Sequence, residues 1–161
     1  LGIALRPKLL IADEPTTALD VTVQAEIMDI LRELKQYLNM AMIIITHDMG
    51  VIAGSCDKVI VMYGGRIMET GLVDDIFYNS KQPYTRGLLA SIPAHNADRV
   101  INKDDQLFMI PGQPPSLLNL PKGCPFYDRC NFRLDCCVND MPDLLAVGDN
   151  NQHKKACHAK L

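Results

Sequence analysis

The hydrophobic pattern in the first third of the chain predicts a strand, a helix and a second strand. Residues 9–12 form a short continuous apolar run, which is typical of a strand buried on both faces. Residues 42–46 form a second such run, rich in β-branched side chains. Between them, apolar residues recur at helical spacing opposite a charged face: Ile27, Ile30, Leu31, Leu34 and Leu38. A unit of this length implies two parallel strands joined by a right-handed crossover.

Polar residues follow each predicted strand at its carboxyl end. Asp13 and Glu14 come after the first strand, and His47 comes after the second. Parallel strands end at the same edge of a sheet, where ligands bind in such folds. There a carboxylate can hold Mg²⁺ and its neighbour can orient an attacking water. The simpler alternatives are a polar loop or helix cap for the acidic pair, and a structural or merely exposed histidine.

Further elements are predicted from local signals along the chain. Asp20 or Thr22 can cap the first helix, and Asn39 can end it. Gly64-Gly65 between two strand-like runs predicts a β-hairpin. The remaining expectations are a helix tail over 1–6, short helices over 49–55 and 72–78 (Ile76 and Phe77 inward), a helix over 84–92 between Pro83 and Pro93, and an extended linker over 94–123.

Composition is that of an ordinary globular chain. The 161 residues are 48% hydrophobic and 22% charged, enough for one domain or a small domain with an appendage. A net charge of −3 gives no sign of nucleic-acid binding. The longest apolar run is too short to cross a bilayer. The first residues lack the features of a signal peptide and an initiator Met, so we expect the chain to be part of a longer protein.

Five of the six cysteines lie after residue 123, at positions 124, 130, 136, 137 and 157. Four thiolates can hold a 4Fe–4S cluster or a zinc ion, and the wide spacing favours iron–sulfur. His153 and His158 are possible zinc ligands. The alternative is a set of unligated or disulfide-bonded cysteines. A short polar segment cannot build its own core, however, and usually needs a metal ion or disulfides to stabilise it. Cys56 is expected to be a buried structural residue.

Three segments in order resemble one enzyme family. Residues 9–20 resemble the Walker B motif and D-loop of ATP-binding-cassette (ABC) ATPases, residues 43–48 the switch-histidine region, and residues 1–7 the helix that follows the signature motif. The resemblance implies an α/β fold, the C-terminal part of a P-loop, RecA-like domain. It implies that Asp13 serves Mg²⁺ and ATP, Glu14 polarises water, His47 contacts the γ-phosphate, and Asp20 meets a second ATPase subunit.

The phosphate-binding loop of that family is missing from this sequence. No Gly-x-x-x-x-Gly-Lys-Ser/Thr occurs in it. We therefore expect the P-loop, Q-loop and signature motif to lie before Leu1, because they supply the groups that grip the phosphates. We also expect this chain alone neither to bind ATP tightly nor to hydrolyse it.

The second half narrows the resemblance. Residues 82–89, 110–115 and 123–130 resemble the C-terminal extension of oligopeptide/dipeptide-importer ATPase subunits. The resemblance implies that an iron–sulfur cluster is bound by four cysteines, with Cys136 left over: Cys124, Cys130, Cys137 and Cys157. It divides the chain into a partial nucleotide-binding domain, residues 1–78, and an extension with the cysteine cluster, residues 79–161.

The resemblance also implies a function. It is that of a peripheral subunit on the cytoplasmic face of the membrane, which couples ATP hydrolysis to the import of di- or oligopeptides, nickel or a related solute. Its partners would be a second ATPase subunit, transmembrane permeases and, indirectly, a substrate-binding protein, but no nucleic acid. One competing hypothesis is a soluble ABC ATPase of translation or DNA repair, which has no reason to carry the extension. Another is a non-catalytic metal-binding regulatory module.

Overall fold

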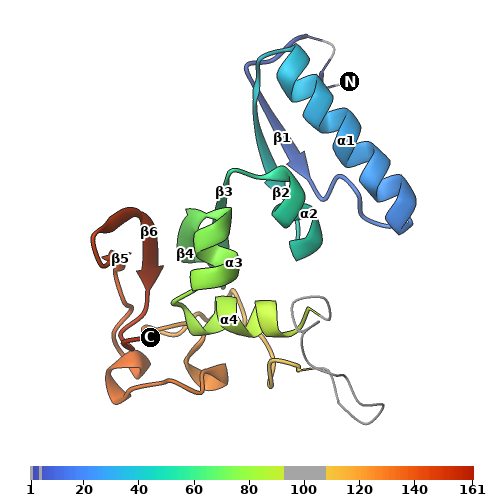
Figure 1. Ribbon diagram of the computed structural model, residues 1–161. Helices are drawn as coiled ribbons and strands as arrows, with labels where there is room; N and C mark the ends of the chain where they lie inside the picture. Colours follow the sequence, from blue (N-terminus) through green and yellow to red (C-terminus); the bar gives the residue numbers. More distant parts are fainter. Residues whose placement is uncertain (1, 4, 93–107) are drawn as a thin grey trace, which may run out of the picture. The chain divides into compact units, whose positions relative to one another are not determined.

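The computed structural model describes residues 2–3, 5–92 and 108–161 (Figure 1). The chain forms two compact units, Leu1–Cys56 and Asp57–Leu161. Both contain helices and strands, so the expected α/β class is confirmed. In the part of the chain that the structure describes, no helix has the length and apolar character needed to cross a membrane.

The first unit is the predicted strand–helix–strand with one more short helix. Its elements are β1 (Leu9–Asp13), α1 (Val21–Tyr37), β2 (Ala41–Ile45) and α2 (Met49–Ser55). β1 and β2 pair in parallel, with Leu9 opposite Ala41 and Asp13 opposite Ile45. The parallel pairing is as predicted, and it brings the carboxyl ends of both strands to one edge.

The ends of α1 follow from local chemistry. Asp20 caps the helix, because its carboxylate accepts the backbone N–H of Val23 at 2.9 Å. Asn39 follows the helix with a φ of +49°, in the left-handed region that often ends helices. Both predicted signals are confirmed.

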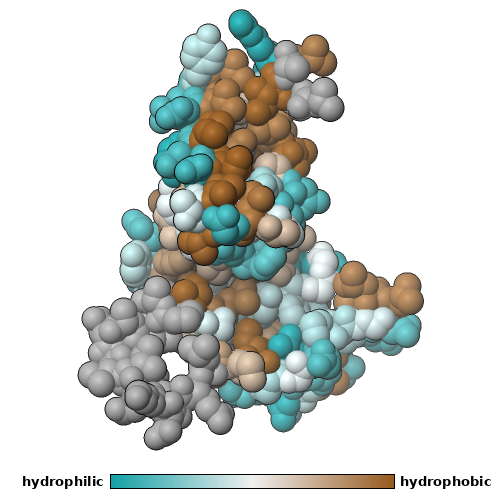
Figure 2. Space-filling model, turned by 90° about the vertical axis from the view of Figure 1, so that its right-hand side faces the viewer, coloured by the Kyte–Doolittle hydropathy of each residue, from teal (hydrophilic) through white to brown (hydrophobic). Residues whose placement is uncertain are grey.

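Burial in the first unit differs from the prediction. Side chains of β1 and β2 alternate between half-buried and exposed, and Leu9, Ile11, Ile43 and Ile45 are 47–60% exposed. The prediction of strands buried on both faces is therefore wrong for this unit. Ile30, on the predicted apolar face of α1, is 50% exposed. A continuous apolar run indicates that both faces of a strand could be buried. It does not indicate which other elements cover those faces. Figure 2 shows the resulting band of hydrophobic surface in its upper part.

The expected helix tail over residues 1–6 is not present in the described part of that segment. Instead, the N–H of Arg6 donates to the carbonyl of Ile3 at 3.0 Å, which closes a turn. Arg6 has a φ of +48°, which is incompatible with a right-handed helix.

The second unit is built on a four-stranded antiparallel sheet in the order β3-β4-β6-β5. Its elements are β3 (Lys58–Tyr63), β4 (Arg66–Leu72), α3 (Val73–Asn79), α4 (Pro83–Ala90), the 3₁₀ turns η2 (Tyr127–Arg129) and η3 (Asp135–Val138), β5 (Leu144–Val147) and β6 (Asn150–Ala156). The predicted hairpin of β3 and β4 is confirmed. Gly64 and Gly65 have φ values of +56° and +73°, as its tight turn requires.

The chain's C-terminal strand joins this hairpin. In the ladder between β4 and β6, Glu69 lies opposite Lys155 and Thr70 opposite Lys154. The hairpin thus shares a sheet with the C-terminal residues, although the sequence assigned it to the nucleotide-binding part, residues 1–78. The β5–β6 hairpin was not predicted. Pro93 and residues 94–107 of the expected linker lie outside the described residues, and residues 108–123 are irregular as expected.

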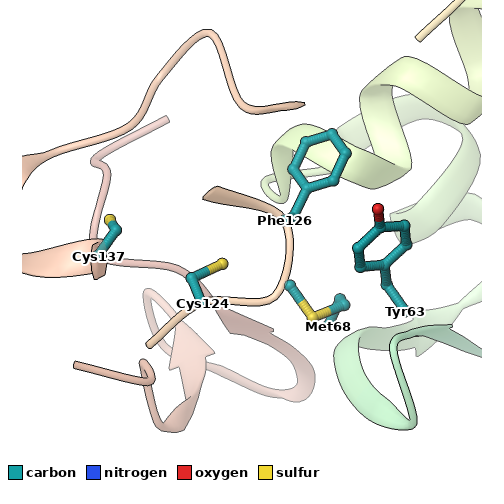
Figure 3. Close-up of a cluster of buried hydrophobic side chains, with 5 residues drawn as sticks. All are labelled: Tyr63, Met68, Cys124, Phe126 and Cys137. Carbon is teal, nitrogen blue, oxygen red and sulfur yellow. The ribbon is translucent and has the colours of Figure 1, made fainter. Parts of the chain in front are cut away.

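The core of the second unit joins the hairpin to the cysteine segment. Tyr63, Met68, Cys124, Phe126 and Cys137 form one buried cluster (Figure 3). The rings of Tyr63 and Phe126 meet edge to face at 5.3 Å between centroids. Two of the predicted metal ligands are therefore part of the hydrophobic core.

Arg129 ties the same region together. Its guanidinium donates to the carbonyl of Ile110 at 3.0 Å, the carbonyl of Pro111 at 2.8 Å and the hydroxyl of Tyr63 at 3.0 Å. Arginine suits this task because its donors form a rigid planar fork. The segment around Ile110 is in this way fixed to both the hairpin and the cysteine segment.

Candidate functional site

The sheet edge of the first unit brings Glu14 and His47 into direct contact. Oε1 of Glu14 lies 2.8 Å from Nδ1 of His47. The other carboxylate oxygen, Oε2, accepts the hydroxyl of Thr17 at 2.5 Å. The N–H of Glu14 donates to the carbonyl of Ile45 at 2.8 Å, which extends the β1–β2 pairing by one bond. These contacts hold the carboxylate at the end of the sheet.

The backbone of Glu14 is in an unusual conformation. Its φ is +48°, a left-handed value that costs a non-glycine residue energy. Such residues concentrate where a side chain must be held in one place for function. Here the turn lets Glu14 bond to Ile45 through its backbone and to His47 and Thr17 through its side chain.

The pair is polarised toward its charged form. The hydroxyl of Thr17, and then the hydrogen bond from His47, lower the pKa of Glu14 below 4.5. The hydrogen bond and the negative charge of Glu14 raise the pKa of His47 above 6.5. The arrangement therefore favours a carboxylate paired with an imidazolium. A carboxylate at this edge can accept a proton from water, and the histidine can donate to an anion.

The two other carboxylates predicted for this site, those of Asp13 and Asp20, lie close to Glu14 in the sequence. Asp13 is the last residue of β1 and is exposed, and Asp20 is the exposed cap of α1. Asp48, which directly follows His47, caps α2 and accepts the side-chain amide of Gln24 at 2.7 Å. This amide is the main cause that lowers the pKa of Asp48. Sequence reasoning missed Thr17, although a hydroxyl three residues after an acid in a Pro-Thr-Thr turn is a usable signal.

The four cysteines predicted as ligands line one small cavity of about 20 Å³ in the second unit: Cys124, Cys130, Cys137 and Cys157. Tyr127, Arg133 and His158 are among its other lining residues. Cys136 is exposed and does not line the cavity. Within the described residues, no group of three or more His, Cys, Asp or Glu side chains is positioned to hold a metal ion. The four cysteines thus border a common space, but among the described residues they do not form a complete set of metal ligands.

Burial and backbone amides act in opposite directions on these thiols. Burial raises the pKa of Cys124 to about 11, and it also raises the pKa of Cys130 and Cys157. The N–H of Phe132 donates to Sγ of Cys130 at 3.3 Å, and this bond favours the thiolate. In the apolar cavity, therefore, the protonated thiols are favoured until a cation compensates them.

Three other residues from the sequence analysis are also placed. His153 lies 2.9 Å from Glu69, fully buried, and does not line the cysteine cavity. His158 lines the cavity and contacts the carbonyl of Asp140 at 3.2 Å. Cys56 is half-buried, so its expected full burial is wrong. It follows α2 directly, where the short helix leaves it partly open.

Comparison with known proteins supports the family suggested by the motifs. Residues 68–137 match the family model "Oligopeptide/dipeptide transporter, C-terminal region". The resemblance of this chain to the C-terminal part of oligopeptide-importer ATPase subunits is confirmed. Within that match lie most of β4, the helices α3 and α4, and the first three predicted ligand cysteines.

Individual relatives agree with this family. The oligopeptide transport ATP-binding protein OppD of Salmonella typhimurium is 55% identical over 142 residues, which are 88% of this chain and 41% of that protein. OppD of Haemophilus influenzae is 56% identical over 85% of this chain and 41% of its own length. OppD of Bacillus subtilis is 46% identical over 96% and 42%. The chain thus spans less than half the length of these relatives.

A solved structure is also similar in sequence. CbiO1 from Clostridium perfringens, described as part of the ABC transporter complex cbiONQ, is 41% identical and covers 45% of this chain and 29% of its own. The TM-score is 0.43, too low for this likeness to establish the fold.

Proposed function

We propose that this chain is the C-terminal part of the ATP-hydrolysing subunit of an ABC importer for di- or oligopeptides, nickel or a related solute. The observation that carries the proposal is the contact of Glu14 with His47 at 2.8 Å, at the carboxyl ends of two parallel strands. The family match over residues 68–137 supports the transport role, because a soluble ABC ATPase has no reason to carry this extension.

Four residues have assigned roles in the proposed hydrolysis of ATP. Glu14 accepts a proton from the attacking water, and its fixed position between Thr17 and His47 supports that role. His47 donates to the γ-phosphate. Asp13, at the end of β1, would hold Mg²⁺, which neutralises charge developing on the phosphates. Asp20 caps α1 and would face the second ATPase subunit across the dimer.

The proposed assembly is peripheral to the cytoplasmic face of the membrane. Two ATPase subunits dimerise and dock on transmembrane permeases, and a substrate-binding protein delivers the solute. The names of the relatives, oligopeptide transport ATP-binding proteins, support this arrangement. The groups that grip the phosphates come from a part of the protein outside this sequence.

The test is Glu14→Gln in the intact subunit, reconstituted with its permeases in lipid vesicles. Glutamine keeps the size of the side chain but cannot accept the proton. We expect ATP hydrolysis to fall by at least about 10²-fold and ATP binding to persist. Glu26→Gln is the matched control, since Glu26 is exposed on α1 and should leave hydrolysis unchanged. Sustained hydrolysis by Glu14→Gln would refute the role of Glu14.

We further propose that the cysteine cavity binds a 4Fe–4S cluster, with zinc as the alternative. The residue types support this proposal, because four cysteines line one cavity and thiolates are the ligands that such clusters require. The ligands would be Cys124, Cys130, Cys137 and Cys157. They would close in as the cluster binds, since metal binding and folding are coupled in small cysteine-rich regions. Measuring iron, acid-labile sulfide and zinc in the anaerobically purified subunit decides between the two. Iron with sulfide indicates the cluster, and zinc without them indicates a zinc site.

A further inference from the structure

A cation borders the cysteine cavity, and neither ATP hydrolysis nor metal ligation uses it. Arg133 lines the cavity although it is exposed on its other side. Its guanidinium carbon lies 5.5 Å from the centre of the Tyr127 ring, which lines the same cavity. This cation–π contact holds a positive charge at the edge of the cavity.

Backbone amides surround the same thiols. The N–H of Phe132 bonds to Cys130, and the amides of Phe126 and Ala159 bond to Cys124 and Cys157. In each case the donor lies two residues after the cysteine. Hydrogen bonds to ligand sulfurs stabilise their negative charge, and they are one of the means by which a protein sets the reduction potential of a cluster.

Charged side chains add to this pattern. Among the residues that line the cavity, Arg133 is the one with a permanent positive charge. The ammonium of Lys155 donates to the carbonyl of Ala159 at 2.7 Å, whereas Arg133 lines the cavity itself. Arg133 is therefore the side chain best placed to compensate negative charge inside the cavity.

We propose that Arg133, held against Tyr127, offsets the negative charge of the bound iron–sulfur cluster and thereby raises its reduction potential. The inference rests on the proposed cluster. Reduction adds one electron and so one negative charge, which a nearby cation stabilises more than it stabilises the oxidised form. Arg133 acts through the charge of the cluster and is not a ligand, so its loss should not release the iron.

The experiment is a redox titration with dithionite of the anaerobically purified intact subunit, followed by electron paramagnetic resonance. The variants are Arg133→Gln, Arg133→Lys and the control Arg66→Gln, an exposed arginine at the start of β4. At a fixed potential, Arg133→Gln should lower the ratio of reduced to oxidised cluster about threefold. This corresponds to a midpoint ~28 mV lower, at 59 mV per tenfold for one electron. Arg133→Lys and Arg66→Gln should stay near wild type, with iron and sulfide content equal in all four proteins.

The outcomes separate this inference from the proposed function. An unchanged midpoint in Arg133→Gln, with the cluster present, would overturn the role of Arg133 and leave the cluster proposal standing. An equal shift in Arg66→Gln would also overturn it, because the effect would then be one of general surface charge. Wild-type subunit without iron and sulfide, whether empty or holding zinc, would overturn the cluster and the inference together.

Discussion

Nε2 of His153 lies 2.9 Å from Oε1 of Glu69, and both side chains are almost completely buried. The two residues are 84 positions apart, on β6 and β4, so the pair joins the C-terminal strand to the central hairpin. The same oxygen of Glu69 accepts the N–H of Lys81 at 2.6 Å, while Oε2 of Glu69 has no hydrogen-bond partner among the described residues. The pair is thus a buried polar contact between two strands. If it is lost, solvent water cannot replace its hydrogen bond.

Replacing His153 with Ala should destabilise the second unit strongly. The change leaves the Glu69 carboxylate buried with only the amide of Lys81, and breaking a buried pair in this way typically costs about 3–5 kcal/mol. Urea unfolding followed by circular dichroism measures the free energy of unfolding. His158→Ala is the control, because that side chain has an exposed carboxylate partner, and we expect a loss under about 1 kcal/mol. A similar small loss for both variants would contradict the prediction.

The contact of Glu14 with His47 should give a pH-dependent stabilisation with a defined window. The pKa of Glu14 is lowered from 4.5, so its contribution is present above pH 4.5 and is lost as the pH falls through its folded pKa. The pKa of His47 is raised from 6.5, so its contribution is complete below pH 6.5 and is lost as the pH rises through its folded pKa. Stabilisation by the pair is therefore greatest between pH 4.5 and 6.5.

Titration of the His47 ring by NMR checks this window. Glu14→Gln should bring the pKa of His47 down toward 6.5, because the hydrogen bond and charge of Glu14 are the main causes of its rise. Thr17→Ala is the matched control. It removes the hydroxyl that lowers the pKa of Glu14 most, so that pKa should rise, while the pKa of His47 stays elevated. A His47 pKa that does not respond to Glu14→Gln would show that the pair does not form in solution.

Gly123 should tolerate no side chain. A Cβ at this position would lie 2.2 Å from the carbonyl oxygen of Cys137 and 2.5 Å from that of Val138. Gly123→Ala must therefore push the two cysteine segments apart, and we expect it to cost about 1–3 kcal/mol of unfolding free energy. Gly54→Ala is the control, since a Cβ there meets nothing within 4 Å and a helical alanine should stabilise by about 0.5–1 kcal/mol. Equal unfolding midpoints for the two variants in urea would contradict the expected clash.

The features that could be predicted from the sequence are those determined by a few neighbouring residues. Gly64-Gly65 specifies its hairpin turn, Asp20 specifies the start of α1, and the parallel strands bring His47 to Glu14. Each signal lies within a few residues or follows from the handedness of one crossover. The meeting of side chains at two adjacent strand ends is therefore predictable from the amino-acid order alone.

What sequence missed depends on contacts between distant segments. Arg129 reaches Tyr63 across 66 positions, and nothing near Arg129 marks it as an anchor. The β4–β6 pairing likewise depends on two segments that are separated by the whole cysteine region. The exposure of the β1 and β2 side chains could not be predicted either, because an apolar run does not indicate which other elements pack against it.

Cys136 and Cys137 are adjacent but should differ completely as ligands. Cys137 is buried and lines the cavity with the other three predicted ligands, whereas Cys136 is exposed. Cys137→Ser should therefore abolish most of the bound iron in anaerobically purified subunit, and Cys136→Ser should leave it at the wild-type level. Iron and sulfide analysis measures both, and the adjacent serine controls for the loss of a thiol. Iron loss in Cys136→Ser with retention in Cys137→Ser would move the third ligand to Cys136. Because the two side chains differ in burial, that result would also require the η3 turn to rearrange when the cluster binds.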